Sequence, residues 1–206
     1  MSISNTFIRF VFAFSFFFIS FAVIAEPTLE EVVVSARKVD ESVQDVPIAM
    51  SVFTSSDISD AGIERPEDFI ALTPNVVMAN TVNVGDTLVT IRGLTSTRDA
   101  ESNFAFVVDG VLQTNPNAFN RELLDIAQIE VLKGPQGALY GRNATSGAIL
   151  ITTKAPSEES ESTAVIGMGV NNASKLQYVN SGKMGDNVYT RSVSYTHLRA
   201  HETSKH

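Results

Sequence analysis

The side chains that most often carry enzyme chemistry are scarce in this chain of 206 residues. It contains no cysteine, and its histidines are His197, His201 and His206, all within the last ten residues. The preceding sequence offers no thiolate, no imidazole to activate a serine and no histidine metal ligand. A secreted hydrolase using carboxylates alone is the alternative, but acids such as Asp109 and Glu130 fall in a predicted turn and a predicted strand. We predict that the chain is not an enzyme and needs no metal or other cofactor.

A glycine-rich stretch, Gly134–Asn143, invites comparison with nucleotide-binding loops. A P-loop needs Gly-Lys-Ser/Thr after its spacer because the lysine reaches the phosphates, whereas Gly141 is followed by Arg142 and Asn143. The stretch is better explained as a tightly turned segment whose glycines allow positive φ and close backbone packing. The formal charge of −8 and the isoelectric point near 4.8 also argue against nucleic-acid binding.

Short strands and short helices fill residues 45–155, which predicts an α+β domain with a small mixed β-sheet. The pair Asp109-Gly110 lies between two apolar runs and predicts a two-residue hairpin. Pro66 opens a helix with acids in its first turn, where the helix dipole favours them. The predicted strands are 48–52, 76–84, 88–91, 104–108, 111–112, 129–133 and 148–153, and the predicted helices are 55–62, 66–73 and 121–127.

The first 25 residues have the pattern of an export signal. Arg9 supplies one positive charge, and an apolar run from Phe10 to Ile24 follows it. The alternative is a membrane anchor, but the run is shorter than the ~20 residues that span a bilayer. We predict a signal peptide, 1–25, that is cleaved after Ala25.

A polar stretch, 26–44, contains one β-prone island. Three consecutive valines favour an extended strand, while the flanking acids and lysine make packing against the domain unfavourable. One interpretation is a tethered strand that adds itself to the sheet edge of a partner. The other is an ordinary first strand of the domain, and the residues alone leave both open. The island comprises Glu30, Glu31, Val32, Val33, Val34, Ser35 and Ala36.

The pattern changes after an acidic, serine-rich linker, 156–162. Apolar and polar residues alternate over 163–193, as in strands of a transmembrane β-barrel. A plugged transporter barrel has about 22 strands of ~9–11 residues, so these would be the first strands of a truncated barrel. Residues 194–206 break the alternation and resemble translated sequencing-adapter read-through, and we hypothesise that this tail is not native.

The segment from Asp125 to Ile149 closely resembles the signature of the plug domain of TonB-dependent outer-membrane receptors. Three further matches follow the expected order: the island 30–36 resembles the Ton box, Ile91-Arg92-Gly93 the Arg-Gly motif, and Val107–Val111 the plug hairpin. Together they cover about residues 28–191. The signature residues are Asp109, Gly110, Glu130, Gly134, Pro135, Gly137, Tyr140, Gly141, Arg142, Asn143 and Gly147.

The resemblance implies the N-terminal part of an outer-membrane receptor that imports a scarce nutrient such as a ferric siderophore. The plug would gate a barrel, and the Ton box would couple it to the inner-membrane protein TonB by strand addition. Arg92 and Lys133 correspond to basic residues that face barrel acids, although plain surface charges are the alternative. Ligand-facing loops would include Thr95, Ser96, Arg98, Asn115 and Asn117. The alternative function is a stand-alone periplasmic plug-like binding module without a barrel.

Overall fold

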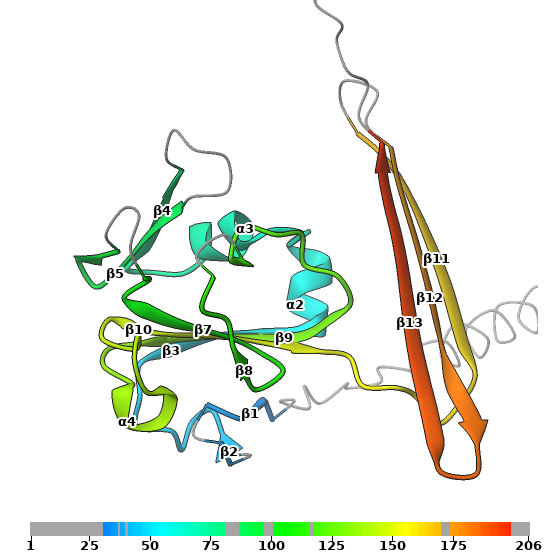
Figure 1. The fold of residues 1–206 in the computed structure, drawn as a ribbon, viewed down its shortest axis with the longest axis horizontal. Coiled ribbons are helices and arrows are strands. Elements are labelled where there is room, and N and C mark those ends of the chain that lie inside the picture. Colours follow the sequence, from blue (N-terminus) through cyan, green and yellow to red (C-terminus); the bar gives the residue numbers. More distant parts are fainter. Residues whose placement is uncertain are drawn as a thin grey trace, which may run out of the picture. The chain divides into compact units, whose positions relative to one another are not determined.

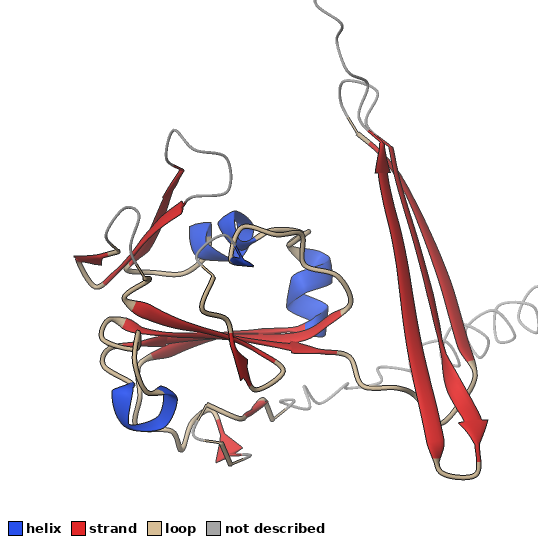
Figure 2. Ribbon diagram, viewed as in Figure 1, coloured by secondary structure: helices blue, strands red, loops and turns tan. Residues whose placement is uncertain are grey.

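The computed structural model describes residues 31–36, 38–39, 41–80, 87–96, 101–115, 118–169 and 174–198 (Figure 1). Strands dominate these residues, and the helices among them are short (Figure 2). No helix within the described ranges is long and apolar enough to cross a membrane.

A five-stranded mixed sheet forms the centre of the domain, in the order β3-β9-β10-β7-β8. β9 and β10 are antiparallel, whereas β10 and β7 are parallel and pair Gly147 with Phe104. The hairpin predicted at Asp109-Gly110 is confirmed, and both residues have positive φ, as a type I′ turn requires. The strands of this sheet are β3 (Met50–Thr54), β7 (Phe104–Val108), β8 (Val111–Leu112), β9 (Ile126–Lys133) and β10 (Gly147–Thr153).

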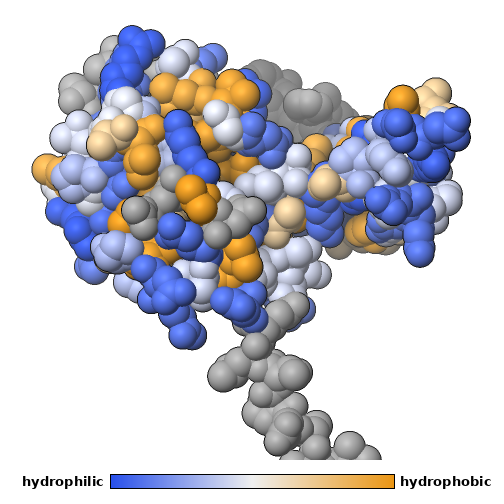
Figure 3. All heavy atoms as spheres, turned by 90° about the horizontal axis from the view of Figure 1, so that it is seen from below, coloured by the Kyte–Doolittle hydropathy of each residue, from blue (hydrophilic) through white to orange (hydrophobic). Residues whose placement is uncertain are grey.

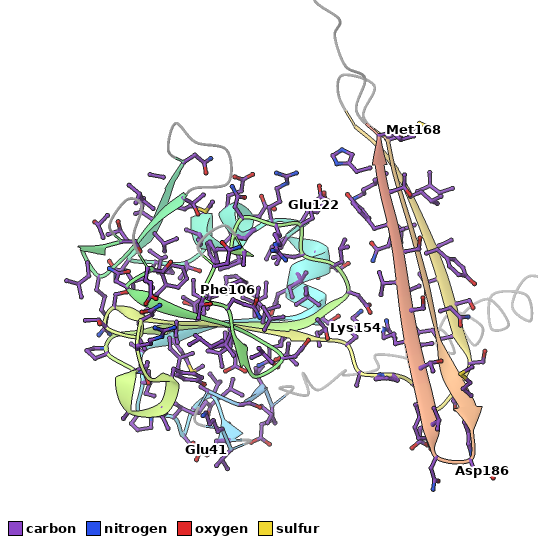
Figure 4. The ribbon with its side chains drawn as sticks, viewed as in Figure 1. Glu41, Phe106, Glu122, Lys154, Met168 and Asp186 are labelled. Carbon is purple, nitrogen blue, oxygen red and sulfur yellow. The ribbon has the colours of Figure 1, made fainter. Side chains whose placement is uncertain are left out.

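The central strands of this sheet are buried on both faces. Successive side chains of a strand point to opposite faces, and β7, β9 and β10 each contain several buried residues in succession. Phe104 and Phe106 of β7 belong to one apolar cluster, whereas Ala105 and Val107 belong to a second. Figure 4 shows Phe106 on the helix side of the sheet. Buried strands of this kind are apolar at nearly every position, so their sequences carry little alternation.

Helices α2 (Ser55–Asp60) and α3 (Pro66–Ala71) lie on the first of these faces (Figure 1). Thr54 caps α2, and its hydroxyl and backbone N–H exchange hydrogen bonds with Asp57. Pro66 begins α3 as predicted, because its missing N–H costs nothing in the first turn. Phe69 of α3 is fully buried against the rings of Phe53 and Phe119.

Smaller sheets complete the described structure. β4 (Val76–Asn80), β5 (Thr87–Ile91) and β6 (Leu94–Thr95) form one of them, and β1 (Val33–Val34) pairs with β2 (Glu41–Ser42) in another. The predicted strand 76–84 is described only as far as Asn80. The one-turn helix α4 (Gly137–Tyr140) lies in the glycine-rich stretch and was not predicted.

A three-stranded antiparallel sheet contains β11 (Glu161–Met168), β12 (Ser174–Gly185) and β13 (Val188–Leu198). Asp186 lies in the tight turn between β12 and β13 (Figure 4). One face carries the exposed side chains of Ile166, Leu176 and Tyr178. β13 continues five residues past 193, so the first residues of the predicted tail form part of a regular strand.

The predicted helix 121–127 is wrong. Residues 121–125 form a loop, and β9 begins at Ile126. Asp125 has a φ of +56°, which no helical residue adopts, and its carbonyl accepts a hydrogen bond from the backbone N–H of Lys154. The helix-favouring residues of this segment are therefore overridden by a contact with a distant strand end.

We expect Phe69→Ala to lower the free energy of unfolding by about 3–5 kcal/mol, because the removed ring leaves a cavity that its aromatic neighbours cannot fill. Leu72→Ala is the matched control, since Leu72 follows α3 and is 54% exposed. It should change stability by less than about 0.5 kcal/mol. Urea titration followed by circular dichroism measures both, and equal losses would contradict the assigned core.

Candidate functional site

The β-prone island is bound to the plug in this structure. β1 pairs with β2, and the exposed fraction alternates: Val33 is 47% exposed, Val34 is 1% exposed and Ala36 is fully buried. Val34 and Ala36 join the apolar cluster on the second face of the central sheet. The expectation that flanking charges keep this segment from packing is therefore wrong for Val32–Ala36, because every second side chain finds an apolar site. Glu31 is exposed, and Glu30 lies outside the described residues.

Three plug side chains contact the backbone of this segment. The side-chain amide of Gln128 donates to the carbonyl of Val33 at 3.0 Å. The backbone N–H of Ser35 donates to Oε1 of Glu130 at 3.1 Å. The hydroxyl of Tyr140 donates to the carbonyl of Ala36 at 2.7 Å. Two strand residues and one helix residue thus hold a segment that lies about a hundred residues earlier in the chain.

Glu130 is a buried acidic residue on a face of the sheet that is otherwise mostly apolar. It is 2% exposed, and its neighbours on the same face of the sheet include Val107, Leu132 and Leu150. Oε1 also accepts a hydrogen bond from Gln128 at 3.3 Å. A buried carboxylate is costly without such partners, so the segment and Glu130 stabilise one another.

A cavity of about 430 Å³ adjoins the docked segment. Its walls include Ser35 and Lys38 from the segment side and Glu130, Tyr140 and Leu150 from the plug. The ammonium of Lys38 lies 5.8 Å from the centre of the Tyr140 ring, a cation–π distance. Figure 3 views the protein from below, the side on which Figure 1 draws β1, β2 and α4, and shows hydrophobic patches between hydrophilic ones.

The side chain of Arg92 lies close to the backbone of Gly134, the residue after Lys133. Gly134 follows Lys133, and a Cβ atom on Gly134 would lie 2.9 Å from Nη1 of Arg92. Nζ of Lys133 donates to Oγ of Ser51 at 3.0 Å. Arg92 is exposed, and among the described residues neither cation forms an ion pair with an acidic side chain.

The other signature residues build turns and close approaches. Asp109 accepts hydrogen bonds from the backbone N–H and the hydroxyl of Thr153 at 2.8 and 3.0 Å. A Cβ on Gly147 would lie 2.3 Å from the carbonyl oxygen of Leu132, so only glycine fits there. Arg142 is exposed, and its Nη1 lies 3.4 Å from Oε1 of Glu101. Pro135, Gly141 and Asn143 flank α4, Gly137 begins that helix, and Gly110 lies in the hairpin between β7 and β8.

The predicted ligand-facing residues differ in exposure. Thr95 is exposed, but Ser96 is 6% exposed and its hydroxyl donates to Asn103 at 2.8 Å. Asn115 is exposed, and its carbonyl accepts the N–H of Ala118. Arg98 and Asn117 lie outside the described residues. Ser96 thus has a structural role, and ligand contact by these loops stays a prediction.

An ion pair that the sequence analysis did not foresee joins Asp125 and Arg191. Nη2 of Arg191 donates to Oδ1 of Asp125 at 2.7 Å, Nε donates to Oδ2, and both side chains are 9% exposed. Arg191 also reaches Glu161 at 3.4 Å. Asp125 opens the signature segment, but no local pattern indicates a partner 66 residues later.

In the described ranges, no group of three or more His, Asp or Glu side chains could hold a metal ion.

A family profile described as TonB-dependent Receptor Plug Domain matches residues 42–148. The pesticin receptor of Yersinia enterocolitica is 28% identical over 170 residues, which are 82% of this chain and 25% of that protein. The vitamin B12 transporter BtuB of Vibrio vulnificus is 28% identical over 165 residues, 77% of this chain and 26% of that protein. The chain spans about a quarter of the length of these relatives.

Solved structures show the same fold. The ferric yersiniabactin uptake receptor FyuA of Yersinia pestis has a TM-score of 0.64 and 27% identity over 69% of this chain and 23% of the receptor. The ferripyoverdine receptor of the outer membrane of Pseudomonas aeruginosa has a TM-score of 0.69 at 20% identity, covering 81% and 22% of the two chains.

Burial, followed by the negative charge of Glu130, raises the pKa of Tyr140 to about 12. An unfolded tyrosine titrates near ~10, so Tyr140 stabilises the fold below that pH and loses its contribution as pH rises through the folded pKa. We expect Tyr140→Phe to remove one tyrosinate transition near pH 12, and part of the alkaline loss of stability. The absorbance of tyrosinate as a function of pH measures this transition. Loss of a transition near pH ~10 instead would contradict the burial of the Tyr140 hydroxyl.

Proposed function

Because the chain belongs to the family of TonB-dependent receptor plug domains, we propose that it is the N-terminal part of an outer-membrane receptor for active nutrient uptake. The observation that carries the proposal is the plug domain, preceded by an extended β-prone segment and followed by amphipathic strands. The relatives are receptors and transporters rather than enzymes. In such a receptor, the plug would lie in the lumen of the barrel, and the segment 30–36 would face the periplasm.

The segment 30–36 is proposed as the Ton box, the site of strand addition by TonB. Strand addition needs an extended backbone with β-favouring side chains, and affinity then comes from main-chain hydrogen bonds. The extended pair Val33–Val34 and the exposed side chains of Val33 and Ser35 support this role. Export by the signal peptide 1–25 would place the segment in the compartment that TonB reaches.

The proposed barrel begins with β11–β13. Their exposed face carries Ile166, Leu176 and Tyr178, and the opposite face carries Lys175, Gln177 and Arg191, as lipid-facing and lumen-facing positions require. This amphipathic pattern favours a receptor over a stand-alone periplasmic module, which would have no use for an exposed apolar face. Arg92 and Lys133 are proposed to pair with acids of the barrel wall, where hydrated ion pairs hold a movable plug.

The proposed ligand is a scarce nutrient that reaches the plug from outside the cell, such as an iron chelate. Relatives are named for ferric yersiniabactin and for vitamin B12, so both an iron chelate and a cobalamin are within the family's range. The plug loops around Thr95 and Asn115 are the proposed contacts in this chain.

We expect Val33→Pro to abolish binding of the periplasmic part of TonB, because proline removes a backbone donor and breaks an added strand. Val33→Thr is the matched control, since threonine keeps the β-branched shape and the donor. Titration calorimetry with the full chain in detergent measures both. Unchanged binding of the proline variant would exclude this segment as the Ton box.

A second test concerns Arg92. Arg92→Gln should change the free energy of unfolding of this chain by less than about 0.5 kcal/mol, because Arg92 is exposed and forms no ion pair within the described residues. In a receptor that joins this plug to a complete barrel, the same change should lower uptake of a radiolabelled iron chelate several-fold. Equal uptake by the Arg92→Gln receptor and by the receptor that keeps Arg92 would identify Arg92 as a plain surface charge.

A further inference from the structure

We infer that a row of polar side chains across β11, β12 and β13 is an anchor that fixes the carboxyl end of the plug to these strands. The row consists of Glu161, Ser181 and Arg191. It holds the plug through Asp125, and it holds the chain that leaves the plug through Ser157. The inference rests on the proposed function, since it takes β11–β13 as the start of the barrel.

Strand pairing places the three side chains of the row at one level of the sheet and on one face. Ser181 pairs with Glu161 on one side and with Arg191 on the other. Residues directly opposite one another on antiparallel strands share a face, and Val179, two positions before Ser181, shares it too. Val179 and Ser181 are buried, although β11–β13 are exposed at most positions. This face is therefore covered where the row lies.

Arg191 joins the row to the plug. Its Nη2 donates to Oδ1 of Asp125 at 2.7 Å and its Nε donates to Oδ2, which is the forked geometry that suits a guanidinium and a carboxylate. Its Nη1 donates to Oε2 of Glu161 at 3.4 Å, so the cation lies between two acids. The side chains of Asp125 and Arg191 are both buried, and removal of either would leave an uncompensated charge.

The backbone of Asp125 is itself fixed, which suits this residue to hold a distant strand. Its φ of +56° lies in the left-handed region, which aspartate and asparagine tolerate better than most residues. Its carbonyl accepts the N–H of Lys154 at 2.9 Å. Asp125 comes directly before β9 and Lys154 directly after β10, so this one residue ties together the start of β9, the end of β10 and, through Arg191, β13.

The residues between β10 and β11 form a strap rather than a free linker. The backbone N–H of Ser157 donates to Oγ of Ser181 at 2.8 Å. A Cβ atom on Gly182 would lie 3.3 Å from Cα of Ser160, so the absent side chain lets the strap lie close against β12. With Lys154 bound to the plug at its other end, the strap is held at its start, its middle and its end.

The anchor has the opposite polarity from the contacts proposed for Arg92 and Lys133. At those residues the plug supplies cations, whereas at the anchor it supplies the carboxylate of Asp125 and the strands supply the guanidinium of Arg191. A plug that carries cations at one place and an acid at another is held in one orientation, because a turned plug would set like charges against each other.

Cysteine labelling measures the anchor in the full chain, which has no cysteine of its own. Val179→Cys places a thiol on the covered face, and its rate of modification by a maleimide reports how often this face opens. Arg191→Gln should raise the rate at least roughly tenfold, because Asp125 is left buried without its cation. Asp125→Asn should raise it similarly while keeping the turn, because asparagine accepts a positive φ. The double variant should label no faster than the faster single variant, since both changes act on one contact.

Matched variants separate the anchor from general destabilisation. Lys183→Gln removes an exposed cation of β12 that forms no ion pair within the described residues, and it should leave the Val179→Cys rate unchanged. Val89→Cys, at a fully buried position of β5, reports opening of the plug itself and should stay protected in the anchor variants. Leu176→Cys, at an exposed position of β12, gives the rate of an accessible thiol.

Unchanged labelling of Val179→Cys in either Arg191→Gln or Asp125→Asn would overturn the anchor. Fully additive effects in the double variant, or an equal rise at Val89→Cys, would overturn it as well. Uptake of a radiolabelled iron chelate is measured separately, in a receptor that joins residues 1–193 to a complete barrel. If the anchor variants of this chain label faster but the receptor takes up no chelate, the anchor stands and the proposed function fails. If labelling rises and the receptor takes up the chelate, both stand.

Discussion

The strands β9, β10 and β7 are covered on both faces, and this double burial governs the rest of the domain. On one face, α2, α3 and a group of aromatic rings exclude water, and on the other the N-terminal segment does so. The buried side of a backbone that covers such a face must find hydrogen-bond partners within the protein. Polar side chains on an otherwise apolar face supply them, which accounts for Gln128 and Glu130 in a strand that is buried at most other positions.

The Glu130 contact couples the burial of a carboxylate to the docking of Val32–Ala36. Oε1 of its carboxylate accepts hydrogen bonds from the backbone N–H of Ser35, which belongs to the docked segment, and from the side chain of Gln128. Removing the segment would expose the carboxylate to water and recover part of its hydration. This recovered hydration would offset part of the free energy lost with the contacts.

Local patterns predicted the features that local chemistry determines. The Asp109-Gly110 turn, the start of α3 at Pro66 and the α+β class follow from residue types within a few positions of each other. The helix predicted over 121–127 failed because Asp125 turns the chain where Lys154 and Arg191, distant in sequence, supply its partners. The docking of Val34 and Ala36 was left open by the residues for the same reason: the apolar site that receives them is built by residues far along the chain. Of the candidate site, the segment and the signature could be read from sequence, but Gln128 has no local signal at all.

The contacts between the plug and Val32–Ala36 also determine when this segment can dock during synthesis. Ser35 and Glu130 are 95 positions apart, and Ala36 and Tyr140 are 104 positions apart. A chain that is synthesised from its N-terminus presents this segment well before the residues that bind it. Until Glu130 and Tyr140 have been synthesised, the β-prone valines have no plug sheet to cover, and an unpaired strand of this kind can pair with other chains. The order of residues along the chain thus leaves this segment without its partners until most of the plug has been made.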